Sequence, residues 1–154
     1  MNKTEVSIRL RLPIGKEQCE ACKGKLKQVL EAQPELQRIM LFDDGEEERV
    51  SLSFRYEEPI SLDAILGGIA DEGATVLQLI VQLPTSLSGV WTISDARNNG
   101  AKISGMVQDV EGVAYAGVSG DGVLRIQMDA EAPDAILEKV MNRLMRWKQQ
   151  NIKK

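Results

Sequence analysis

Two cysteines, Cys19 and Cys22, are the residues of this sequence best suited to carry chemistry. The 154-residue chain has no other cysteine and no histidine. On a helix, side chains three residues apart lie on the same face, so the two sulfurs can share one ion. A helix N-terminus also favours the thiolate, which is the form that binds soft metals. The pair therefore predicts a metal site with Cys19 and Cys22 as ligands.

Two other interpretations of the pair stay open: a dithiol redox centre, and two surface thiols with no dedicated ligand. The lack of histidine removes the commonest general base and any Ser/His or Cys/His catalytic arrangement. The sequence also shows no paired-carboxylate motif and no phosphate-binding loop. We therefore expect a protein that is not an enzyme.

The elements that must position the cysteines follow from the spacing of apolar residues. Alternation of apolar and polar residues predicts strands, and a helical period predicts the segments between them. Strands are expected at residues 6–12, 36–42, 50–56 and 76–83, with helices between Gln18 and Pro34 and between Ser61 and Gly73. The order strand, helix, strand, strand, helix, strand is that of a ferredoxin-like α/β sandwich in the α+β class.

The same pattern begins again after residue 89. It predicts a strand at 89–94, a helix at 101–110, a hairpin over 113–128 and a helix from Pro133. Lys25-Leu26 then superposes on Lys102-Ile103, and the two cysteines superpose on Ala96 and Asn99. The prediction is two tandem ferredoxin-like domains, residues 1–84 with the cysteines and residues 89–154 without them.

The second predicted domain has no counterpart of the strand at 76–83, so it is expected to lack its last strand. Its first strand, at 90–94, would then have an uncovered edge. Pairing of that edge with residues 76–83 in a single sheet is one solution, and a homodimer through the same edge is the other. The oligomeric state, monomer or homodimer, stays open.

Charge and hydropathy restrict the compartment and the partners. The formal net charge of −4 argues against bulk binding of nucleic acid. The sequence contains neither an apolar run long enough to cross a bilayer nor a secretory signal, so we expect a cytoplasmic protein without a membrane partner.

The cysteine pair and its surroundings resemble the heavy-metal-associated domain family, the module of copper chaperones, mercury-binding proteins and the N-terminal regions of metal-pumping ATPases. The resemblance rests on Cys19 and Cys22, Leu26 and Leu30, the strand Val50–Tyr56 with Glu58-Pro59 after it, and the series Ile65, Ile69 and Gly73. Where the family usually has Gly-Met-Thr before the first cysteine, this chain has Lys16-Glu17-Gln18. This departure predicts a more exposed thiol pair.

The resemblance implies metal binding or trafficking, with a metal-transporting ATPase as a partner. Two thiolates without an imidazole suit Cu(I) or Hg(II), and the resemblance favours Cu(I). Zn(II) prefers four ligands, so it would need Glu17, Glu20 or Glu72, or groups from a partner. The alternative function is a protein-interaction module that has kept the fold without using the metal site.

Overall fold

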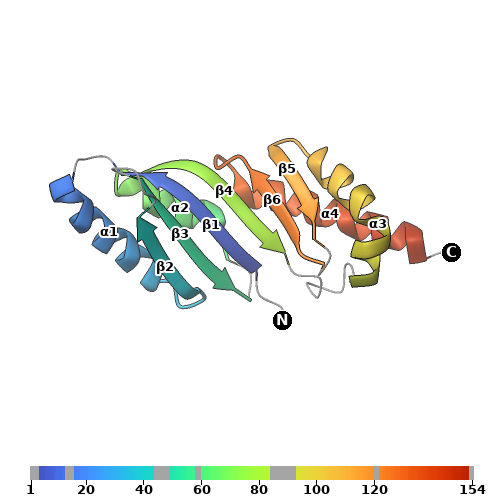
Figure 1. Cartoon of the computed structure of the whole chain (residues 1–154), viewed down its shortest axis with the longest axis horizontal. Helices are drawn as coiled ribbons and strands as arrows, with labels where there is room; N and C mark the ends of the chain where they lie inside the picture. The colour runs from blue at the N-terminus through green and yellow to red at the C-terminus, as the bar shows by residue number, and fades with distance from the viewer. Residues whose placement is uncertain are drawn as a thin grey trace. The chain divides into compact units, whose positions relative to one another are not determined.

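The computed structural model describes residues 4–12, 16–43, 49–57, 60–83, 93–119 and 122–152, with backbone alone for residues 16–23, 43, 93–97 and 151–152. Its elements are shown in Figure 1: β1 (Thr4–Arg11), α1 (Lys16–Glu31), β2 (Gln37–Asp43), β3 (Arg49–Tyr56), α2 (Leu62–Asp71), β4 (Thr75–Leu83), α3 (Ile93–Gln108), β5 (Val113–Val118), β6 (Leu124–Met128) and α4 (Pro133–Ile152). The described strands are hydrogen-bonded in the order β2-β3-β1-β4-β6-β5. This arrangement confirms the predicted α+β class and the ferredoxin-like architecture.

The first compact unit spans Glu5–Leu79 and contains the strand order β2-β3-β1-β4. Its core follows directly from the alternation in the sequence, because every second residue of β1 and β3 is buried. Ile8 and Leu10 on β1 and Phe54 on β3 are at most 1% exposed. Leu26 and Leu30 of α1 are fully buried as well. The predicted alternation of β1 and β3 and the apolar face of α1 at Leu26 and Leu30 are therefore confirmed.

Helix α2 begins and ends where the sequence predicts. The Oγ atom of Ser61 accepts a hydrogen bond from the backbone N–H of Ala64 at 3.1 Å, which satisfies one of the free amides of the first turn. At the other end Gly73 adopts a φ of 87°, a conformation that disfavours residues with a Cβ. Because both ends are fixed locally, short-range sequence signals were sufficient to predict this helix.

The second compact unit comprises Ile80–Lys154 together with the N-terminal residues up to Thr4. Its strands are the last four residues of β4, then β6 and β5. The buried residues that build its core come from both helices and both strands of the hairpin: Ile103, Val107, Ala116, Leu124, Ile126, Val140 and Leu144. The predicted linker at residues 84–89 lies outside the described residues.

The predicted strand at 89–94 is wrong in its described part. Ile93 and Ser94 belong to α3, and both neighbours of β4 are already taken by β1 and β6. The predicted pairing of residues 76–83 with residues 90–94 is therefore wrong too. Strand β4 comes before α3, β5, β6 and α4, just as β1 comes before α1, β2, β3 and α2. It occupies the place of the first strand in that second series.

Two further expectations about the second half need correction. Helix α3 begins at Ile93, eight residues before the predicted start, and it continues across a non-helical Asn99 (φ −129°, ψ 18°). Met145, expected on the buried side of α4, is 48% exposed, while Val140 and Leu144 on the same helix are buried. The apolar spacing of α4 therefore includes Met145, a position that is not buried in the core.

Gly112 is the residue whose replacement we expect to disturb the second unit most directly. It has a φ of +96°, and a Cβ there would lie 2.6 Å from Ile136 Cδ1. Gly112→Ala should therefore lower the free energy of unfolding by about 1–3 kcal/mol, from the left-handed backbone and the crowding. Gly105→Ala on α3 is the control, because a Cβ there meets nothing within 4 Å; it should raise stability by about 0.5–1 kcal/mol. Urea denaturation measures both, and equal stability of the two variants would contradict the prediction.

Candidate functional site

Cys19 and Cys22 both lie on α1, as its fourth and seventh residues. The helix begins at Lys16, two residues earlier than the sequence predicted. The pair is therefore within the first two helical turns instead of at the junction between strand and helix. The two side chains are outside the described part of the structure, whereas the helical backbone at both positions belongs to it.

The helical backbone suits a two-sulfur site. Positions three residues apart on a helix have Cβ atoms roughly 5–6 Å apart, a span that one ion can bridge with two sulfurs. The field of the helix N-terminus acts within the first turn, so it reaches position 19 more strongly than position 22. Two thiols without imidazole fit a soft ion of low coordination number. The donor set therefore fits Cu(I) or Hg(II) better than Zn(II).

The rest of α1 anchors these positions to the first unit. Leu26 and Leu30, four and eight residues after Cys22, are fully buried. On the next turn, Val29 approaches α2 so closely that a Cβ at Gly68 would lie 3.0 Å from its Cγ1 atom. By helical spacing, positions 19 and 22 continue the side of α1 that carries Leu26. The thiol pair is thus placed by a helix whose second half is held firmly in the core.

The additional ligands considered for zinc are not brought together in the described structure. Glu72 is the C-cap residue of α2, and the side chains of Glu17 and Glu20 lie outside the described residues. Among the residues with described side chains, no group of three or more Cys, Asp, Glu or His could hold a metal ion. A complete four-ligand site is therefore not found there.

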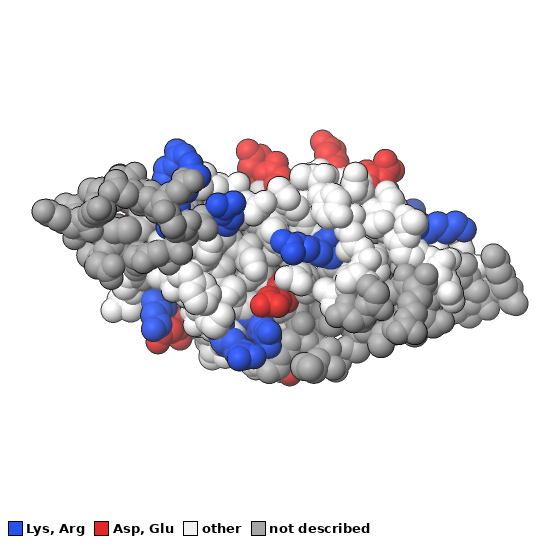
Figure 2. All heavy atoms as spheres, viewed as in Figure 1, with Lys and Arg blue, Asp and Glu red and all other residues white. Residues whose placement is uncertain are grey.

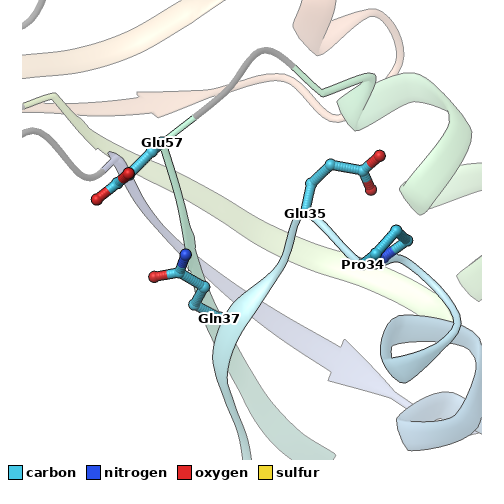
Figure 3. Close-up of a pocket in the computed structure, with 4 residues that line it drawn as sticks. All are labelled: Pro34, Glu35, Gln37 and Glu57. Atoms are coloured by element: carbon cyan, nitrogen blue, oxygen red, sulfur yellow. The ribbon is translucent and has the colours of Figure 1, made fainter.

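A polar hollow of about 370 Å³ lies in the first unit, between the start of β2 and the end of β3, lined by Pro34, Glu35, Gln37 and Glu57. Figure 3 shows the carboxylate of Glu35 directed away from that of Glu57. The two carboxylates do not converge on a common point, as a metal ion or an acid–base pair would require. We assign no site to this hollow.

Ala96 and Asn99, the positions on which the two cysteines superpose in the second half, belong to α3. Neither residue type offers a sulfur ligand.

The sequence did not predict one concave region of the second unit. A hollow of about 440 Å³ lies over β5, β6 and the end of β4, and Tyr115, Gly117 and Arg125 are among its lining residues. In sequence these residues are only polar positions of a hairpin. No sequence signal marks them, because their proximity depends on the strand register that sets Gly117 opposite Arg125.

Comparison with known proteins gives weak likenesses. No protein-family model matches the sequence, and no curated protein matches it. The N-terminal soluble domains of Bacillus subtilis CopA are 18% identical, with 94% of this chain and 91% of that chain covered and a TM-score of 0.41. The N-terminal extension of Cupriavidus metallidurans CzcP is 19% identical, with 90% of this chain and 96% of that chain covered and a TM-score of 0.36. A putative chlorite dismutase is 11% identical, with 94% of this chain and 86% of that chain covered and a TM-score of 0.45.

Both the sequence identities and the superpositions of these three are low. Every identity is below 20% and every TM-score is below 0.5. At these values none of the three carries an argument about this chain. Among the described helices, none is long and apolar enough to cross a membrane.

Proposed function

We propose that this protein binds one soft metal ion through Cys19 and Cys22, and that the ion is Cu(I). The observation that carries the proposal is the placement of a CxxC pair in the first two turns of α1, directly after β1, in a ferredoxin-like unit. The resemblance of residues 1–84 to heavy-metal-associated domains supports the same chemistry. The ion is cargo, held by two thiolates that keep it available for transfer to another set of thiols.

The composition supports a single site of low coordination number. With two cysteines and no histidine in the whole chain, the protein itself offers two thiolates, ligands of the kind that Cu(I) prefers. Zn(II) would need two more ligands, from carboxylates or from a partner. The order of affinity we expect is therefore Cu(I) above Zn(II).

Titration of the reduced full-length protein with Cu(I) against a competing chelator tests the proposal. The expected result is saturation at one ion per chain, with affinity that falls as the pH is lowered because protons compete for the thiolates. Zn(II) titrated in the same way should bind more weakly. Retention of all Cu(I) by the chelator, or a stoichiometry above one, would contradict the proposal.

The second candidate function is a metal-free interaction module. The departure at Lys16-Glu17-Gln18 favours it, because these positions differ from the residues usual before the first cysteine of a metal loop. The two functions differ in a simple measurement, since an interaction module would not take Cu(I) from the chelator.

In either case we propose a protein that is not an enzyme and that acts in the cytoplasm. If the metal is transferred, we propose a metal-transporting ATPase as the recipient.

A further inference from the structure

The hollow on the second unit lies on the face of the hairpin that the helices do not cover. Ala116 on β5 and Ile126 on β6 are directly paired and buried. Because side chains alternate along a strand, their neighbours Gly117 and Arg125 lie on the opposite face. Tyr115, two residues before Gly117, lies on that face as well and is 55% exposed. The hollow is therefore open to solvent over a hydrogen-bonded part of the sheet.

The absence of a side chain at Gly117 makes room for the ring of Tyr115. A Cβ at this position would lie 2.9 Å from Tyr115 Oη and 3.3 Å from Tyr115 Cε2. The tyrosine ring therefore leans along β5 over the glycine, toward the position opposite Arg125. Tyr115 and Arg125 both line the hollow.

The far wall of the hollow is fixed by the end of the hairpin. The backbone N–H of Val123 donates to Ser119 Oγ at 3.1 Å, and the backbone N–H of Ser119 donates to Val123 O at 3.0 Å. Gln82 of β4 adds an amide to the lining. This wall does not have to form when a ligand arrives, which reduces the entropy lost on binding.

The residues that line the hollow suit an anion that carries a planar ring. Among the described lining residues, Arg125 is the one that carries a charge, and none has a carboxylate. A guanidinium presents a planar set of donors that matches a carboxylate or a phosphate, and a tyrosine ring offers a face for stacking. The volume of about 440 Å³ lies within the usual range of small-molecule sites.

The surroundings favour a small ligand over a long polyanion. Figure 2 shows Lys and Arg side chains at several separate places on the viewed face, with Asp and Glu side chains and uncharged surface among them, whereas a strand of nucleic acid would need a continuous basic track. We propose that this hollow binds a small organic anion, with its carboxylate or phosphate on Arg125 and its flat ring against Tyr115. The site is independent of the thiol pair and gives the half without cysteines a function of its own.

Calorimetric titration of the full chain with four probes tests the proposal. Adenosine monophosphate and indole acetate each combine a ring with an anionic group, whereas inorganic phosphate has only the charge and adenosine only the ring. At least one of the first two should bind with a dissociation constant below about 1 mM and at least about 10-fold more tightly than phosphate or adenosine.

Three variants locate the binding. Arg125→Gln should weaken it by at least about 10-fold, as expected for a lost charge-assisted hydrogen bond. Gly117→Ala should also weaken it, without loss of thermal stability, because the added Cβ displaces only the outer end of an exposed tyrosine ring. Arg146→Gln, which removes the same charge from an exposed position of α4, should have no effect.

The proposal is overturned if no probe binds saturably, if phosphate alone binds as tightly as the ring-bearing anions, or if Arg125→Gln and Arg146→Gln behave alike. The double variant Cys19→Ser, Cys22→Ser should leave this binding unchanged. The result for the hollow is therefore separable from the result for the metal.

Discussion

Replacement of both Cys19 and Cys22 by serine is expected to abolish Cu(I) binding in competition with a chelator, a loss of at least about 100-fold in affinity, because hydroxyl oxygens are poor ligands for a soft ion. Each single replacement should produce most of that loss, since one remaining thiolate cannot hold a two-coordinate ion alone. Far-UV circular dichroism and urea denaturation should show a folded protein in all three variants. The measurement is the same chelator titration as for the unaltered chain.

The controls for this prediction are two methionines that are exposed in the described part of the structure, because thioethers are the other soft ligands in the sequence. Met40 is 44% exposed and Met145 is 48% exposed. Met40→Leu and Met145→Leu should leave the Cu(I) affinity within about twofold, since exposed substitutions of similar size change little else. If the double cysteine variant kept the affinity, or if either methionine variant lost it, the proposed ligand set would be incorrect.

Phe54→Ala is expected to cause the largest loss of stability from a single core substitution, about 3–5 kcal/mol. Phe54 is fully buried on β3, and its ring centroid lies 6.5 Å from that of Tyr56. Truncation leaves a cavity in the core of the first unit and removes this contact. Because a domain of this size has a total stability on the order of 5–15 kcal/mol, we expect a large decrease in the urea midpoint.

Phe42→Ala is the matched control, because the same side chain is removed from the neighbouring strand β2. Phe42 pairs with Ser51 across the strands and is 52% exposed. Its truncation should lower stability by no more than about 1 kcal/mol, since removal of a half-exposed ring leaves no closed cavity. Similar losses for the two variants would mean that the core does not lie where the structure places it.

Much of the first unit could be predicted from the sequence because local signals fix it. Ser61 caps α2 and Gly73 ends the helix through contacts within a few residues. The alternation in β1 and β3 identified the buried face without any knowledge of pairing. The helical spacing of Cys19 and Cys22 was predicted in the same way, although α1 begins two residues earlier than expected.

The second half was predicted less well because residue type and apolar spacing do not show which neighbouring elements are present. Ile93 looks like a strand residue by type but belongs to α3. Met145 fits the apolar stripe of α4 by spacing, yet it is exposed, because a helical period says nothing about whether a neighbouring element is present.

The sequence by itself determined the class of the fold, the limits of most strands and helices, and the types of residue available to bind a metal, because these depend on neighbours a few residues apart. The tertiary structure decided that β4 lies beside β1 and β6, and that Gly117 lies opposite Arg125. Strand neighbours and register depend on hydrogen bonds between residues distant in the chain, for which a single sequence has no periodic signal.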